Sequence, residues 1–207
     1  MGSMSAIVGT AAWSAYDEGY LRAYQWAASL AGGSALPQEA PTVQLGPGEV
    51  AHAHFAPVSI VGYYGENVPY RKSFLLLGGP VGWAVTGAAS YAHNQSKKRQ
   101  AEQAAVPSWH TLGQADVVLT GQRIALTLNG QVESLWFAET GAPEWSAGPD
   151  GPAITINAPS MPPLRLLTSW APLLFVFAHH LVDGRPPGVP MPEGLLDRAR
   201  AQGLLAG

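Results

Sequence analysis

Residues 115–130 read ADVVLTGQRIALTLNG, and this stretch decides the fold class of the chain. It contains two apolar runs, 115–120 and 123–128, and the second has aliphatic residues at every other position. Such alternation is typical of a strand with one buried face. The Asn-Gly pair that follows predicts a tight hairpin, because both residues tolerate positive φ. With a return strand over 131–139, this region is predicted to be an antiparallel meander.

Further strands are predicted on both sides of this meander. They cover residues 49–64, 70–77, 153–157 and 164–168. Residues 141–152 contain several glycines and prolines and are expected to form a loop. The chain therefore contains a series of strands in tight succession.

Helices are predicted at both ends of the chain and in an insert. The apolar residues of 170–182 recur at helical spacing, and the Asp-Gly pair that follows ends this helix. An N-terminal helix is expected over 11–30 and a short C-terminal one over 193–205. A helical insert is expected over about 81–105, and it is predicted to begin with a helix of small residues over 81–92.

Three stretches resemble sequences of bacterial PH-like and GRAM-like domains, in particular uncharacterised actinobacterial members. In the meander, Leu119-Thr120 precedes a basic residue, Arg123, then an aliphatic strand and a tight hairpin, as in that group. The stretch PPLRLLTSWAPLLFVFAHHLV, residues 162–182, resembles its last strand and the helix that plugs the domain.

The third stretch is NQSKKRQAEQAAVPSWHTLG, residues 94–113. It is similar to a basic, alanine-rich segment that ends in a tryptophan. Many members have a basic residue directly after that tryptophan, whereas this chain has His110. This difference from the group weakens the inference that position 110 binds a ligand here.

The resemblance implies an α+β fold of the PH-like kind. In this fold a bent antiparallel sheet, or partial barrel, has one open end plugged by a C-terminal helix. The domain would span residues 49–184, after an N-terminal helix and linker in 1–48 and before a tail with a short helix in 185–207. Members of the group bind lipid headgroups, peptides or themselves, and no catalytic activity is implied.

Charged residues make up only 12% of the 207 residues, and the net charge is −3. The chain therefore lacks the basic balance of a nucleic-acid-binding protein. Few charges also leave apolar surface to be covered, which favours a homodimer. The absence of cysteine excludes disulfides and thiolate metal sites. No secretory signal is recognised, so we expect a cytoplasmic protein, and no cofactor is expected.

An aromatic stripe marks the predicted N-terminal helix. Trp13, Tyr16, Tyr20 and Tyr24 recur at helical spacing. The stripe packs either on the main domain or on a partner, and its burial contributes several kcal/mol in both cases, at about 25 cal/mol per Å². We expect these four residues to form a self-association surface.

A stretch without charge, residues 73–96, lies between two basic groups. A Gly-Gly-Pro turn interrupts it, and the remaining helix of about 20 Å, at ~1.5 Å per residue, is too short to cross a bilayer. We expect a helix buried in protein. The flanking basic cluster is a candidate surface for anionic lipid or another anionic ligand, or else a solvated helix end. It consists of Arg71, Lys72, Lys97, Lys98 and Arg99.

Two histidine pairs are candidates for metal binding. His52 and His54 share one strand face, but no third ligand is evident, so partly buried strand histidines are favoured. Glu49 and Glu66 are the carboxylates nearest to this pair in sequence.

His179 and His180 are adjacent on a helix and point in different directions, so they cannot chelate one ion together. His179 and Asp183 have i, i+4 spacing, which predicts a surface His–Asp pair. No metal site is expected at either histidine pair.

No catalytic constellation is evident, because G-x-S-x-G elbows and phosphate-binding glycine loops are missing from the sequence. Glu139, Glu144 and Asp150 lie in or beside one loop, but paired carboxylates catalyse only at particular separations. The favoured function is a non-catalytic binding or self-assembly module. The alternatives are peripheral binding to anionic membrane lipid, and an enzyme or carrier that uses the barrel interior. The last would be favoured by a large polar-lined pocket with His52 and His54.

Overall fold

The computed structural model describes residues 13–65, 106–148 and 150–205. Its strands are β1 (Ala51–Tyr64), β2 (Ser108–Thr120), β3 (Arg123–Leu128), β4 (Gln131–Trp136), β5 (Glu144–Gly148), β6 (Gly151–Ala158) and β7 (Met161–Leu167). Its helices are α1 (Ala15–Ala31), α3 (Phe137–Thr140), α4 (Ala171–Asp183) and α5 (Leu195–Ala201). The predicted α+β class is confirmed. The predicted strand 70–77, the helical insert and the basic cluster lie outside the described residues.

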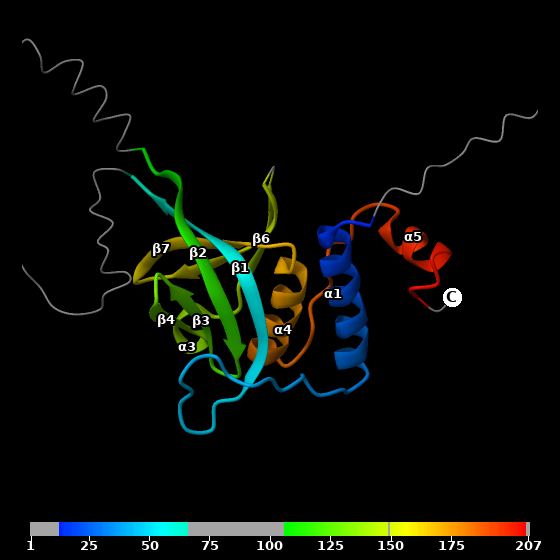
Figure 1. Ribbon diagram of the computed structural model, residues 1–207, viewed down its shortest axis with the longest axis horizontal. Coiled ribbons are helices and arrows are strands. Elements are labelled where there is room, and N and C mark those ends of the chain that lie inside the picture. The colour runs from blue at the N-terminus through cyan, green and yellow to red at the C-terminus, as the bar shows by residue number, and fades with distance from the viewer. Residues whose placement is uncertain (1–12, 66–105, 149, 206–207) are drawn as a thin grey trace, which may run out of the picture.

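The strands form one open antiparallel sheet in the order β4-β3-β2-β1-β7-β6-β5 (Figure 1). β1 pairs with β2 from Ala51 to Tyr64 and with β7 from Ser59 to Gly62. Residues 59–62 of β1 therefore have a paired strand on both sides. β1 joins two meanders, β1 to β4 and β5 to β7, and three register shifts in its pairing with β2 interrupt the ladder, as bulges that bend a strand do.

The hairpin that was predicted from Asn-Gly is confirmed. Asn129 and Gly130 have φ angles of 52° and 76°, and β3 has the predicted bounds. β4 is shorter than predicted, because the chain turns into α3 at Phe137. The predicted loop over 141–152 is wrong, since β5 lies within it and pairs with β6.

The main core lies between one face of the sheet and α4. Ile60, Ile154 and Leu166 from the sheet and Leu174 and Phe177 from α4 are each at most 2% exposed. The helix predicted over 170–182 is confirmed as α4. The Asp-Gly stop signal is confirmed too, because Gly184 has a left-handed φ of 70°.

α1 forms a second helical layer on top of α4 (Figure 1). The two helices approach closely at Gly19, where an added Cβ would overlap the backbone carbonyl of Ser169. The Trp26 ring packs edge-on against Phe177, with ring centroids 5.2 Å apart. Glycine at position 19 is therefore a requirement of this packing.

α5 lies on the far side of α1 (Figure 1), where Arg198 forms an ion pair with Asp17 at 2.7 Å. Asp17 also completes a capping box with Ser14 at the start of α1. Burial alone would raise the pKa of Asp17, but hydrogen bonds from Ser14 and the charge and hydrogen bond of Arg198 lower that pKa below its usual value. One carboxylate thus caps α1 and anchors α5.

The linker between α1 and β1 crosses the outer face of the sheet, opposite α4. Its Val43 and Leu45 cover a small second core that includes Val118 and Ala125. This end of the outer face is therefore covered by the chain itself.

A buried ion pair fixes the end of this linker. Arg123 donates from Nε and Nη2 to the two carboxylate oxygens of Glu49, at 2.8 and 3.1 Å. The Thr120 hydroxyl and the Gly46 amide also donate to this carboxylate. The Glu49 side chain is 0% exposed and the Arg123 side chain 10%. Glu49 is thus occupied by Arg123 and does not serve as a carboxylate for His52 and His54.

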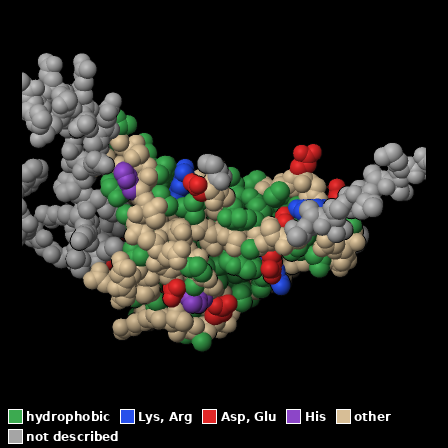
Figure 2. Space-filling model, turned by 45° about the horizontal axis from the view of Figure 1, so that its top comes forward, with side chains coloured by type: hydrophobic (Ala, Val, Ile, Leu, Met, Phe, Trp, Pro, Cys, Tyr) green, Lys and Arg blue, Asp and Glu red, His purple; other side chains and the backbone are tan. Residues whose placement is uncertain are grey.

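Charged side chains are few and scattered on the face shown in Figure 2, where hydrophobic and neutral polar atoms dominate. Within the part of the chain that the structure describes, no helix is long and apolar enough to cross a membrane.

Candidate functional site

Side chains from five strands meet on the outer face of the sheet, at the end away from the linker. Trp109 on β2 lies opposite Tyr63 on β1, and Thr155 on β6 lies between Arg165 on β7 and Glu144 on β5. They alternate along their strands with buried core residues, so they point away from α4. They line a cleft of about 460 Å³, which we call the Arg165 cleft.

The guanidinium of Arg165 is held in place from two sides. Its carbon lies 3.9 Å from the centroid of the Trp109 ring, and its Nε donates to the Thr155 hydroxyl at 3.4 Å. Tyr63 supports the indole, with ring centroids 5.1 Å apart. A cation over an indole face gains about 0.5–2 kcal/mol, so the aromatic pair orients the guanidinium before any ligand arrives.

The charge of Arg165 is not neutralised within the described residues. Neither of its terminal nitrogens has a hydrogen-bond partner there, and no described carboxylate forms an ion pair with it. Arg165 is half-buried, so these donors face the cleft with restricted solvation. Two free, parallel N–H donors suit the bidentate binding of a carboxylate or phosphate.

Glu144 lines the same cleft from β5. It is exposed, and it forms no ion pair with any described lysine or arginine. Glu144 and Arg165 are two strand spacings apart, which places their Cα atoms roughly 10 Å from each other. Among the described residues, the cleft therefore holds one cation and one anion without an ion-pair partner, at separate positions.

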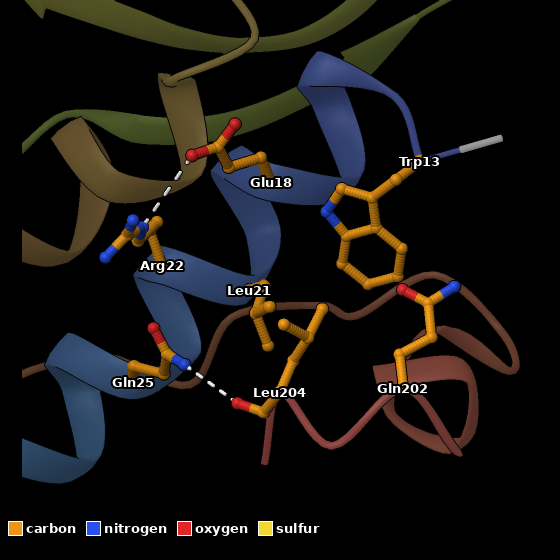
Figure 3. Close-up of a pocket in the computed structure, with 7 residues that line it drawn as sticks. All are labelled: Trp13, Glu18, Leu21, Arg22, Gln25, Gln202 and Leu204. Atoms are coloured by element: carbon orange, nitrogen blue, oxygen red, sulfur yellow. Dashed lines mark hydrogen bonds and ion pairs between the residues drawn. The ribbon is translucent and has the colours of Figure 1, made fainter. Parts of the chain in front are cut away.

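A second cavity, of about 560 Å³, lies between α1 and the segment after α5 (Figure 3). Three of its polar side chains have partners within the lining. Glu18 pairs with Arg22, and Gln25 donates to the carbonyl of Leu204. This cavity is better described as the seam between α1 and the C-terminal segment.

A third cavity, of about 420 Å³, lies between α1, the linker, β1 and α4. Its walls are mainly apolar and include Trp26, Trp170 and Phe177. His54 also lines this cavity. His52 does not line it, and the Nδ1 of His52 lies 2.7 Å from the Pro37 carbonyl. The polar pocket with both histidines that would favour an enzyme or carrier is thus not formed here.

The four aromatic residues of the predicted N-terminal helix have different surroundings, and Trp13 lies before the start of α1. Tyr20 packs on Trp145 of β5, and Trp13 lies 5.6 Å from the guanidinium of Arg198. Tyr16 and Tyr24 are 46% and 37% exposed. The stripe therefore packs partly on its own chain, and two of its tyrosines remain accessible.

The predicted His179–Asp183 pair is confirmed, with Nδ1 2.7 Å from the carboxylate. The other ring nitrogen of His179 lies 2.9 Å from the Pro143 carbonyl, which ties α4 to the start of β5. His180 points elsewhere, and its Nδ1 is buried without a partner in the described structure. The described residues contain no group of three or more side chains that could hold a metal ion.

Sequence reasoning missed the Arg165 cleft. A signal was present in the stretch PPLRLLT, where one arginine interrupts an otherwise apolar strand. His110, which departs from the PH-like pattern, stacks on Tyr64 at 4.4 Å and lies 2.9 Å from the Ser108 hydroxyl. The neighbouring Trp109, rather than His110, lies in the cleft.

Comparisons of the chain with protein-family models, with curated proteins and with solved structures found no match.

Proposed function

We propose that the chain is a non-catalytic binding module with a PH-like fold, and that its ligand binds in the Arg165 cleft. The strand order supports the PH-like assignment. The pairing of β1 with β7 joins two antiparallel meanders, and the helix that follows the last strand, α4, packs on the core face of the sheet. This agrees with a bent sheet that is plugged by a C-terminal helix.

The observation that carries the binding function is the guanidinium of Arg165. A cation that is stacked on an indole, bonded at Nε and free at both terminal nitrogens is pre-organised for an anionic group. Long arginines on a protein surface are usually mobile and solvated. The aromatic wall of Trp109 and Tyr63 also offers flat apolar surface to the body of a ligand.

The lining of the cleft favours binding over catalysis. Ser146 and Thr155 supply hydroxyl groups, but no described histidine, lysine or carboxylate hydrogen-bonds to either one. A hydroxyl nucleophile needs such a base beside it to lose its proton. Glu144 is the one carboxylate among the described residues that line the cleft. This lining therefore does not supply the pair of carboxylates that glycosidase-type chemistry uses.

The proposal is tested with aromatic anions, for example benzoate, indole-3-acetate and phenyl phosphate. Binding is followed by the indole N–H signals in ¹H–¹⁵N NMR, with Trp109 assigned from Trp109→Phe. We expect at least one anion to shift the Trp109 signal in the wild type and not in Arg165→Gln. Arg185→Gln is the matched control, because Arg185 is exposed and outside the cleft. Shifts that persist in Arg165→Gln, or no shift with any anion, would refute the assignment of the site.

A further inference from the structure

Resting on the proposed function, we infer that the Arg165 cleft binds a dipolar ligand. Such a ligand carries a carboxylate that meets Arg165, a protonated amine that meets Glu144, and a flat or apolar side chain beside the carboxylate. Oligopeptides with free termini have this chemistry, and so do longer chains with an acidic and a basic side chain close together.

The charges of the cleft support a dipolar ligand over a simple anion. Glu144 and Arg165 line one cavity, and neither is neutralised by another described residue. A simple anion at Arg165 would leave Glu144 without a ligand partner and would add a like charge to the same cleft. Like charges placed together oppose binding, whereas complementary charges select the partner. A ligand with both charges satisfies both residues.

The spacing of the strands gives a first length for a probe peptide. Thr155 lies between Glu144 and Arg165 in register, so their Cα atoms are roughly 10 Å apart, given about 4.8 Å between neighbouring strands. An extended peptide advances at most about 3.5 Å per residue. An extended tripeptide is therefore about as long as this backbone spacing, and it is the probe used in the test.

The aromatic side of the cleft indicates the nature of the body. Tyr63 is 37% exposed, and its ring lies against Trp109 beside the guanidinium. An aromatic or otherwise flat side chain next to the carboxylate of the ligand would stack on this surface. Aromatic pairs add about 0.5–1.5 kcal/mol to the burial of their area, so this contact adds selectivity to the two charge contacts.

The test uses the tripeptide Gly-Tyr-Gly and two capped forms, one acetylated at the N-terminus and one amidated at the C-terminus. Affinity is measured by the Trp109 indole shift in the wild type, Arg165→Gln and Glu144→Gln. Loss of one charge-assisted contact should weaken binding at least roughly tenfold. We expect acetylation to weaken binding to the wild type and not to Glu144→Gln. Amidation should weaken binding to the wild type and not to Arg165→Gln.

The outcomes separate this inference from the proposed function. If the acetylated peptide binds the wild type as tightly as the free one, the amine is irrelevant and the dipolar inference is wrong. Aromatic anions that still bind through Arg165 would then leave the proposed function standing. A tripeptide capped at both ends, Ac-Asp-Tyr-Lys-NH₂, distinguishes side-chain charges from free termini, and its binding through both residues also supports the inference. Urea midpoints equal to that of the wild type confirm that both variants are folded.

Discussion

Replacement of Glu49 by glutamine tests whether the buried ion pair holds the linker on the sheet. Glu49→Gln preserves the size of the side chain and removes its charge. Arg123, with a side chain only 10% exposed, is then left without its counter-charge. The other contacts of Arg123, with the Gln44 carbonyl, the Ser134 hydroxyl and the Trp136 ring, involve no charged group and cannot replace the carboxylate.

The expected loss of stability is large. Removal of one partner of a buried ion pair costs roughly 3–5 kcal/mol, because the other charge stays buried and uncompensated. The glutamine oxygen can still accept one hydrogen bond from Arg123, so we expect the lower end, about 3 kcal/mol. With a urea m-value of about 2 kcal/mol/M, the midpoint of unfolding falls by roughly 1.5 M.

The measurement is urea unfolding followed by circular dichroism. Glu18→Gln is the matched control, because Glu18 and Arg22 are 3.8 Å apart and their side chains are 45% and 58% exposed. That change should cost less than about 0.5 kcal/mol. The double variant Glu49→Leu with Arg123→Met removes both charges and should recover most of the stability. Equal small effects of Glu49→Gln and Glu18→Gln would refute the reasoning.

The same pair predicts a pH dependence. Burial alone would raise the pKa of Glu49, but hydrogen bonds from Arg123, the Gly46 amide and the Thr120 hydroxyl, with the Arg123 charge, lower it below its usual value. A carboxylate with a lowered folded-state pKa contributes stability above its unfolded value, about 4.3, and loses that contribution as the pH falls through the folded value. The wild type should therefore lose more stability than Glu49→Gln below about pH 4.

Three further predictions concern the helical layer and the surface. Gly19→Ala should destabilise the fold by at least about 2 kcal/mol in urea, because α1 must move off Ser169, whereas Gly188→Ala, with open space around it, should be neutral. The wild type should be a dimer in light scattering and Tyr16→Glu with Tyr24→Glu a monomer; a monomeric wild type contradicts self-association. The wild type should sediment with vesicles that contain anionic lipid, whereas a variant with all five residues of the basic cluster changed to glutamine should not. Equal sedimentation of the two proteins would exclude a role of the cluster.

Local sequence signals were sufficient where one segment determines its own structure. The Asn-Gly hairpin, the alternation in β3 and the Asp-Gly end of α4 all depend on residues that are neighbours in sequence. β5 was missed because its five residues stand among glycines and prolines. Its extended form is fixed by pairing with β6, from Glu144 opposite Thr155 to Gly148 opposite Gly151.

The candidate site could not be predicted because its parts are distant in sequence. Trp109 and Arg165 come together because β2 and β7 both pair with β1, so their side chains meet across that strand. Of the buried ion pair between Arg123 and Glu49, the sequence drew attention only to Arg123, through the PH-like resemblance. Its partner Glu49 stands 74 residues earlier, and the sequence assigned no role to it beyond its proximity to two histidines.

The position of β1 also bears on how the protein is made. The edge that β1 offers to β7 stays open until the ribosome has added about 100 further residues, which takes roughly 5–20 s at common rates of synthesis. During that time the nascent chain presents unpaired N–H and C=O groups next to an apolar face that α4 will cover later. Such an edge is a template for pairing with other chains. Losses to aggregation should therefore arise during translation, before the last strand has emerged.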